Sequence, residues 1–229
     1  MPLNQNDEII IDDIPIHIQR KKHFKRLSIK VHPYQGVVLN APLYMSIRII
    51  ETFLAAAGPW IRKHYQSIEP LYFQQGEKHA FLGVHYPLNL IICHSKSDVV
   101  LDNHQLNIYS QRFDSQIVKE QLHGFYQRQA HVLFPSRVLS CMKLTPWVKS
   151  MPKLKYRFMT SRYGSCSSLG NISLNIHLIK AKTELIDYVI LHELCHIQEH
   201  HHGPQFYQLM EEVMPNWRSL KAELKRFIF

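Results

Sequence analysis

One apolar helix with ionisable residues inside it limits the folds open to this chain more than any other segment. Residues 183–202 read TELIDYVILHELCHIQEHHH, with the pattern H-E-x-x-H beginning at His192. Four residues turn an α-helix by about 400°, so His192 and His196 leave one face a turn apart and can share a metal ion. Glu193 lies about 100° round the helix, beside such an ion, where it can hold water. Because these side chains would be costly to bury without a partner, the segment predicts a metal site.

The residue types at this site favour zinc. Imidazole nitrogens are common zinc ligands, and a catalytic zinc keeps three protein ligands and one open position. Zinc lowers the pKa of a bound water to about 7, and a neighbouring carboxylate can complete the deprotonation and pass the proton to a leaving group. We therefore expect one Zn²⁺ ion, held by His192 and His196 with a third ligand, and Glu193 as the catalytic base.

The third ligand must come from the residues that follow the helix. His200 is two turns beyond His192, about 12 Å along the axis, and so continues past the ion. His202 follows His192 by ten residues, the offset of the third histidine in H-E-x-x-H-x-x-G-x-x-H, although Glu199 replaces the glycine of that pattern. The helix stop at Gly203-Pro204 lets the chain return at His202.

Other third ligands remain open on geometry alone. A carboxylate from the next helix, Glu211 or Glu212, is a competitor that the offset of His202 disfavours. His201 has the same freedom as His202, and spacing separates these two weakly. We expect Cys166 and Cys195, which lie close to the motifs, to be small buried residues and not ligands.

The bulk composition is that of a soluble globular protein. Apolar residues make up 45% and charged residues 20% of the 229 residues. No stretch approaches the roughly 20 apolar residues that span a bilayer, and we expect that the acid-containing start does not act as a signal peptide. None of the four cysteines forms a C-x-x-C pair. We therefore expect a cytoplasmic, reducing location and no membrane association.

Because the net charge is +9, binding to an acidic partner such as nucleic acid has to be considered. Residues 19–30, QRKKHFKRLSIK, carry six lysines and arginines and no acid, and no helix-turn-helix or RNA-binding pattern surrounds them. Two interpretations stand: a solvated turn with the outward face of a strand, or a phosphate-binding surface. The second would give weak association with nucleic acid.

Hydrophobic periodicity predicts an α+β fold in two domains, residues 1–112 and 113–229. The first is β-rich, because apolar residues alternate over 14–18, 27–31 and 37–39 and again within 79–110. A helical pattern from Ser46 is interrupted by Gly58-Pro59, which predicts a kinked helix or a helical hairpin.

The second domain is predicted to be helical with a small sheet. A helix follows Arg112 and is expected to break at Pro135. Two strands, 153–160 and 171–180, are joined by the turn-rich SRYGSCSSLG. Thr183 is the expected N-cap of the metal-site helix, and two shorter helical segments follow Pro204 and Pro215.

Over nearly its whole length the chain resembles the YgjP-like family of predicted metal-dependent hydrolases, related to the SprT-like zinc proteases. The matching residues are Arg162, Gly164 to Ser167, Gly170, Asn171, Asn175, His192 to His196, His202, Phe206, Pro215 and Trp217. The resemblance implies a zincin-type core in residues 113–229, and it places the third histidine of the family at His202. It implies a zinc metallohydrolase, most simply a metallopeptidase acting on peptides or proteins.

The chain departs from the family pattern at Tyr163, His201, Gly203 and Tyr207, which puts substrate preference in doubt more than metal binding. Arg162 and Tyr163 are candidates to stabilise an oxyanion, and Asn175, with His177 on the same predicted strand face, is a candidate to line the cleft. Two alternatives remain: a nucleic-acid-associated zinc protease of SprT type, and a metal-binding scaffold without catalysis.

Overall fold

The chain forms two compact units, and each is described by itself. The computed structural model describes residues 6–32, 36–66 and 72–226. The units comprise Met1–Leu71 and Tyr72–Phe227, so the division does not fall at residue 112 as expected. The strands of residues 78–110 belong to the second unit because they pack on the helix that follows them. No helix among the described residues is long and apolar enough to cross a membrane.

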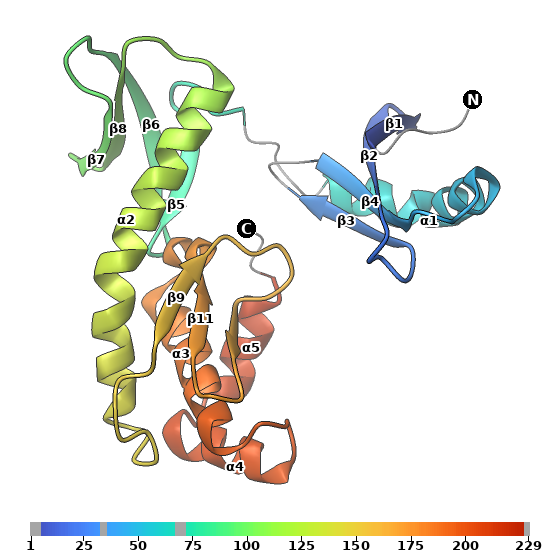
Figure 1. Cartoon of the computed structure of the whole chain (residues 1–229). Helices are drawn as coiled ribbons and strands as arrows, with labels where there is room; N and C mark the ends of the chain where they lie inside the picture. Colours follow the sequence, from blue (N-terminus) through green and yellow to red (C-terminus); the bar gives the residue numbers. More distant parts are fainter. Residues whose placement is uncertain (1–5, 33–35, 67–71, 227–229) are drawn as a thin grey trace. The chain divides into compact units, whose positions relative to one another are not determined.

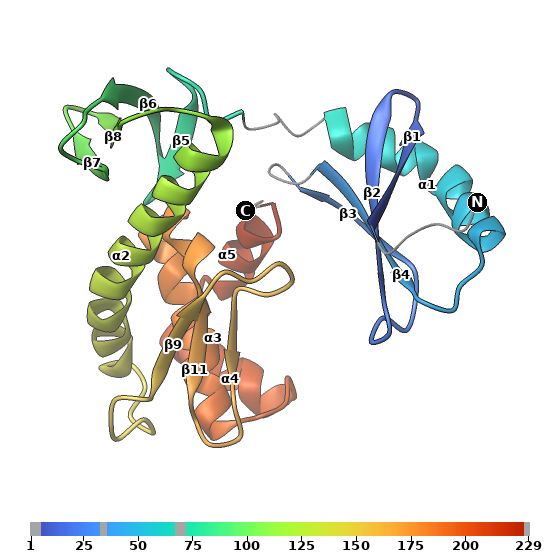
Figure 2. The same cartoon turned by 45° about the horizontal axis from the view of Figure 1, so that its top comes forward.

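The first unit is a four-stranded sheet covered by one helix. Its strands are β1 (Asn6–Ile11), β2 (Ile14–Lys21), β3 (Ser28–His32) and β4 (Gly36–Pro42), in the order β1-β2-β4-β3. β2 and β4 are parallel, and the other two pairs are antiparallel. Helix α1 (Ile47–Gln66) packs on the sheet, where Ile50, Leu54 and Ile61 join Ile16 and Leu39 in one core (Figure 2). The predicted strands are confirmed, and β1 was not predicted.

Neither helical proline ends its helix. α1 runs through Pro59 as one helix, and α2 (Ser115–Met142) runs through Pro135 (Figure 1). The predicted hairpin and the predicted break at Pro135 are therefore wrong. A proline removes one hydrogen bond from the helix. Buried residues on both sides of each proline, Leu54 and Ile61 in α1 and Phe134 and Val138 in α2, hold the helix together through packing.

The basic segment divides into one structural arginine and an exposed set. Arg20 donates from Nη2 to the carbonyl oxygens of Leu43 and Met45, both at 2.7 Å, and so ties β2 to the chain after β4. The other cations are exposed: Lys21, Lys22, Lys25, Arg26 and Lys30. Their association with nucleic acid stays a prediction.

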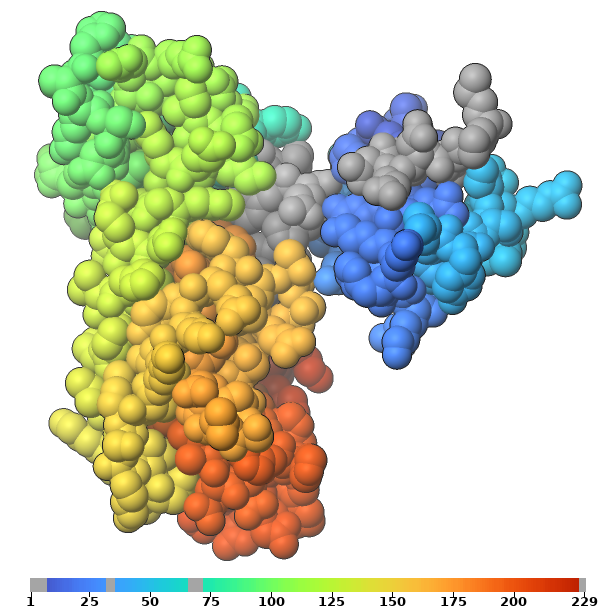
Figure 3. Space-filling model, in the orientation of Figure 1, coloured from blue at the N-terminus to red at the C-terminus, as the bar shows by residue number. Residues whose placement is uncertain are grey.

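The second unit is built along α2. Its first sheet has the order β5-β6-β8-β7, formed by β5 (Lys78–Phe81), β6 (Val84–Ile92), β7 (Asp98–Asp102) and β8 (Gln105–Ser110). In Figure 3 the green residues of this part of the chain lie at one end of the unit, and orange and red residues of the C-terminal part lie at the other. Tyr126 of α2 donates from its hydroxyl to the carbonyl of Ala80, and Arg137 forms a two-point ion pair with Asp187. α2 thus connects the β5–β8 sheet to the part of the unit that contains Asp187.

The remaining elements surround the metal-site helix. A three-stranded sheet has the order β10-β11-β9, formed by β9 (Leu154–Arg157), β10 (Gly164–Cys166) and β11 (Ile172–Asn175), and β11 leads into a 3₁₀ helix, η1 (Ile176–Lys180). Three helices follow: α3 (Thr183–Gln198), α4 (Pro204–Val213) and α5 (Trp217–Leu224). β10 lies within the predicted turn, and the strand expected over 171–180 ends at Asn175. Lys182, not Thr183, is the N-cap of α3, without a side-chain bond.

Lys180 should make the stability of the fold depend on pH. It is 5% exposed, its ammonium lies 4.9 Å from the ring centre of Tyr126, and burial lowers its pKa to about 7 from 10.5. Between these values the unfolded chain binds more protons than the folded one, so stability rises with pH. We expect Lys180→Met to raise the free energy of unfolding by about 2 kcal/mol at pH 6. The gain should shrink towards pH 10.

Urea unfolding at pH 6 and pH 9.5 measures this effect. Lys149→Met, at an exposed position, is the matched control and should show no such change with pH. An equal effect of Lys180→Met at both pH values would contradict the assignment.

Candidate metal centre and cleft

Three histidines converge at the end of α3. His192 and His196 leave one face of the helix, and His202 returns from the loop between Gln198 and Pro204. Each offers one ring nitrogen, and the three nitrogens lie within 4.8 Å of one another. Nε2 of His202 is 3.1 Å from Nε2 of His192. Pro204 occupies the first turn of α4, as expected, so the chain turns back directly after His202.

These residues fit a metal ion. Two nitrogens on one tetrahedral zinc lie about 3.3 Å apart, since each Zn–N bond is about 2.0–2.1 Å. Nδ1 of His196 donates to the carbonyl oxygen of Glu199 at 2.9 Å, which leaves Nε2 with its lone pair for a ligand bond. Burial, with His196 and His202 nearby, lowers the pKa of His192 to about 3. The imidazole is therefore neutral, as a ligand must be.

Phe206 of α4 supports all three imidazoles. Its side chain is 1% exposed, and its ring centre lies 4.9, 4.5 and 4.7 Å from those of His192, His196 and His202. An apolar support of this kind restricts the rotamers of the rings and limits water on one side of the site. The sequence placed Phe206 in a helix without giving it this role.

The competing ligands point elsewhere. Glu211 accepts hydrogen bonds from Nε1 of Trp217 and from Arg218, and Glu212 accepts one from Gln208. His200 and His201 are exposed and are not in the group of converging nitrogens.

Both nearby cysteines remain neutral thiols. Cys195 is fully buried, and burial raises its pKa to about 12. Burial and the carboxylate of Glu193 raise the pKa of Cys166 to about 11. Neither sulfur belongs to the converging ligand atoms of the described residues, although Cys166 is half-buried and not buried as expected.

Glu193 is held by the backbone of β10. Its side chain is 5% exposed, and burial raises its pKa to about 8, while Arg162 and a hydrogen bond from the backbone of Cys166 act in the opposite direction. A Cβ atom at Gly164 would lie 2.6 Å from Oε1 and 2.9 Å from Cγ of Glu193. Only glycine lets β10 approach the carboxylate so closely. The segment read as a turn is therefore the strand that positions the acid.

A cavity of about 210 Å³ adjoins the histidines. Its lining comes from four places in the chain: Arg162, Tyr163 and Gly164; Tyr188 and Val189; His192 and Glu193; and Leu224. Of the three predicted transition-state or cleft residues, Arg162 and Tyr163 line this cavity. The hydroxyl of Tyr163 donates to the carbonyl of Leu224 at 2.8 Å, which ties the loop to α5. Tyr188, one turn before His192, could have been found from the helical period, but nothing in the sequence pointed to Leu224.

Asn175 does not line this cavity. Its side chain is fully buried: Oδ1 accepts from the amides of Met159 and His177, and Nδ2 donates to the carbonyls of Met159 and Arg162. Three of these four hydrogen bonds hold the loop that carries Arg162, and the fourth, from the amide of His177, caps η1. His177 lies in η1 and packs against Phe158, with ring centres 4.9 Å apart. Asn175 is the last residue of β11 and also the N-cap of η1, so the predicted strand face ends there and His177 lies in η1.

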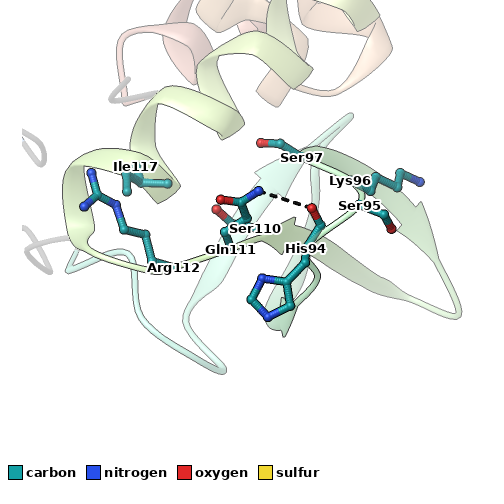
Figure 4. A pocket seen from close by; sticks show the side chains of 8 residues that line it. All are labelled: His94, Ser95, Lys96, Ser97, Ser110, Gln111, Arg112 and Ile117. Carbon is teal, nitrogen blue, oxygen red and sulfur yellow. Dashed lines mark hydrogen bonds between the residues drawn. The ribbon is translucent and has the colours of Figure 1, made fainter.

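A larger cavity, of about 340 Å³, lies at the start of α2 (Figure 4). Its polar lining residues are His94 to Ser97 and Ser110 to Arg112, and Gln111 donates to the carbonyl of His94 at 3.2 Å. In Figure 4 the side chains of Lys96 and Arg112 point away from each other. Lys96 pairs with Asp98 at 3.6 Å. The charges therefore do not converge on one point, in contrast to the three histidines.

Comparison with known proteins gives the family. The model of the YgjP-like metallopeptidase domain matches residues 25–227. The chain belongs to the YgjP-like family. Membership of this metallopeptidase family makes the protein a hydrolase whose family implies a metal, and the His192–His196–His202 group is where this chain can hold it.

Two solved structures are similar over part of the chain. The metallopeptidase zymogen abylysin of Pyrococcus abyssi has a TM-score of 0.38 and 18% identity, covering 40% of this chain and 91% of that one. The metallopeptidase zymogen jannalysin of Methanocaldococcus jannaschii has a TM-score of 0.37 and 19% identity, covering 41% and 94%. Among curated proteins, none matches this YgjP-like chain.

Proposed function

We propose that this YgjP-like chain is a zinc-dependent peptidase with one ion on His192, His196 and His202 and with Glu193 as general base. The observation that carries the proposal is the convergence of three imidazoles next to a buried carboxylate. A structural zinc site is closed by four protein ligands, whereas a catalytic one leaves a position open. Within residues 6–32, 36–66 and 72–226 three ligands converge, and His202 is exposed, which supports the catalytic assignment.

The chemistry follows from the positions of the side chains. A bound zinc ion supplies a Lewis acid that makes water nucleophilic near neutral pH and polarises a carbonyl group. Glu193 takes the proton of the attacking water at its carboxylate and gives it to the leaving amine nitrogen. The backbone amide of Cys166 keeps that carboxylate oriented through both transfers.

Arg162 is the stronger candidate to stabilise the negative charge that forms on the substrate oxygen. Its guanidinium is positively charged, it lines the cavity beside Glu193, and its charge acts on that carboxylate. Tyr163 lines the same cavity, but its hydroxyl proton is already donated to the carbonyl of Leu224. We therefore assign the electrostatic role to Arg162 and a wall of the cleft to Tyr163.

Metal removal tests the proposal. Purified protein is expected to contain one zinc per chain and to cleave unstructured peptides. A chelator should abolish cleavage, and stoichiometric zinc should restore it. Elemental analysis measures the zinc content, and mass spectrometry of the peptide products measures cleavage on the same sample.

A scaffold role predicts a different result. If the metal only closes the fold, the zinc-loaded protein will cleave no peptide, and chelation will lower the melting temperature without any change in hydrolysis. Full cleavage by metal-free protein would contradict the zinc mechanism itself.

A further inference from the structure

We propose that the 210 Å³ cavity beside the histidines is a specificity pocket for an uncharged, apolar substrate side chain of the size of leucine or phenylalanine. The inference rests on the proposed peptidase function and adds the class of substrate to it. It concerns a side chain that flanks the scissile bond.

The cavity is continuous with the reacting groups. His192 and Glu193 are themselves part of its lining. A peptide whose carbonyl lies between these residues has a side chain within reach of the cavity, because the side chain and the carbonyl belong to the same or the next residue. The pocket is therefore placed to select substrates at the cleaved bond.

The walls are largely apolar and fixed. Tyr188, Val189 and Leu224 are 5%, 3% and 5% exposed, and the ring of Tyr163 completes the lining. The hydrogen bond from Tyr163 to the carbonyl of Leu224 holds the loop and α5 together across the cavity. A preformed apolar pocket of this kind binds an apolar group without paying for reorganisation.

The volume of the cavity limits the size of the substrate side chain that it can bind. A dry apolar cavity of roughly 150 Å³ is known to hold benzene. A cavity of about 210 Å³ therefore has room for a phenyl ring or an isobutyl group. An alanine side chain would leave most of that space unfilled and would lose the contacts that a larger group makes with the walls.

Ionised side chains are disfavoured by the lining of the pocket. Arg162 and Glu193 lie in the same lining with opposite charges, so the pair gives no net attraction to a side chain of either sign. A charged group would also lose its hydration against the apolar walls.

Single-side-chain probes test the pocket without any cleavage. N-acetylated amino-acid hydroxamates of phenylalanine, leucine, alanine and lysine place a metal-binding group and one side chain at the site. We expect the phenylalanine and leucine probes to bind the zinc-loaded protein at least about 10-fold more tightly than the other two. Isothermal titration calorimetry measures these affinities.

Substitutions at Val189 change the volume in both directions. Val189→Ile should reduce the preference for phenylalanine over alanine several-fold, and Val189→Ala should increase the preference for phenylalanine over leucine. Ile190→Val is the matched control, because Ile190 is fully buried on the same helix but does not line the cavity. Melting temperatures show that each variant folds.

The outcomes separate the pocket from the peptidase function when cleavage of a mixed peptide pool is measured in parallel. Selective hydroxamate binding without any cleavage supports the pocket and refutes the proposed activity. Cleavage with no preference at either side of the bond, and equal affinity for all four probes, overturns the pocket and leaves the activity. Selectivity that does not respond to Val189 also overturns the pocket.

Discussion

Glu193→Gln is expected to lower kcat for peptide hydrolysis by about 10²–10⁴-fold while zinc binding is retained. The amide has the shape of the acid but cannot take a proton from water. Its size lets it remain beside Gly164, where there is no room for a larger change. KM should change little, because the substitution removes an interaction of the transition state and not of the bound peptide. Steady-state kinetics with elemental analysis of the same preparation measures both.

Glu184→Gln is the matched control, since Glu184 is an exposed acid in the first turn of the same helix. It should leave kcat and metal content unchanged. A Glu193→Gln protein that holds zinc and cleaves at the wild-type rate would refute the general-base assignment.

Stability of the metal-free protein gives a second readout for Glu193→Gln. Burial raises the pKa of Glu193 to about 8 from 4.5. The folded chain therefore binds the extra proton between these values, and wild-type stability falls as pH rises through that range. The glutamine variant does not lose stability in this way. The difference in free energy of unfolding between the variant and the wild type should therefore favour the variant more at pH 8 than at pH 4.5.

The second large effect is expected at the third ligand. His202→Ala should weaken zinc binding by at least about 100-fold, because changes to groups that only support a ligand already cost 10–100-fold. The loss follows from the 3.1 Å approach of the rings of His202 and His192, which the alanine removes. Competition with a chelating dye measures the affinity.

His201→Ala is the control for the neighbouring histidine. Its ring is exposed and lies outside the group of converging nitrogens, so its removal should leave zinc affinity unchanged. If zinc binding is retained in His202→Ala but lost in His201→Ala, the third ligand is His201 and not His202.

The helix around H-E-x-x-H could be predicted because its geometry is local. The spacing of His192 and His196 places their rings on one face of any α-helix. The return of His202 depended on a helix stop that Gly203-Pro204 makes visible in the sequence. The structure brings these three rings together as spacing and resemblance had indicated.

The support of Glu193 could not be predicted from local patterns. β10 has three residues, and its strand character comes from pairing with β11 and not from alternation. Its glycine and serine are typical of a turn for that reason. Asn175 was misplaced on the same grounds, because the backbone groups that it bonds become neighbours only when the loop folds around it.

Tertiary packing also explains why the predictions at the two prolines and at the domain boundary differ from the structure. Gly58-Pro59 predicts a kink or a hairpin and Pro135 predicts a break. Both helices nevertheless continue, because apolar packing on both sides of each proline offsets the one hydrogen bond that is lost. A division at residue 112 follows from the change from strands to helix. It misses that the β5–β8 strands have their packing partner in α2, later in the chain.

The residues of the metal site lie close together in the sequence, whereas the residues that complete the cleft lie farther away. The three imidazoles come from one continuous stretch, His192 to His202, whereas the strand that orients Glu193 begins at Gly164 and the far wall of the cleft is Leu224. Contacts between near neighbours in sequence form earlier than distant ones, because their loops close at lower entropic cost. We therefore expect the ion site to form before the cleft is complete. Peptide cleavage should begin only after β10 and α5 have docked.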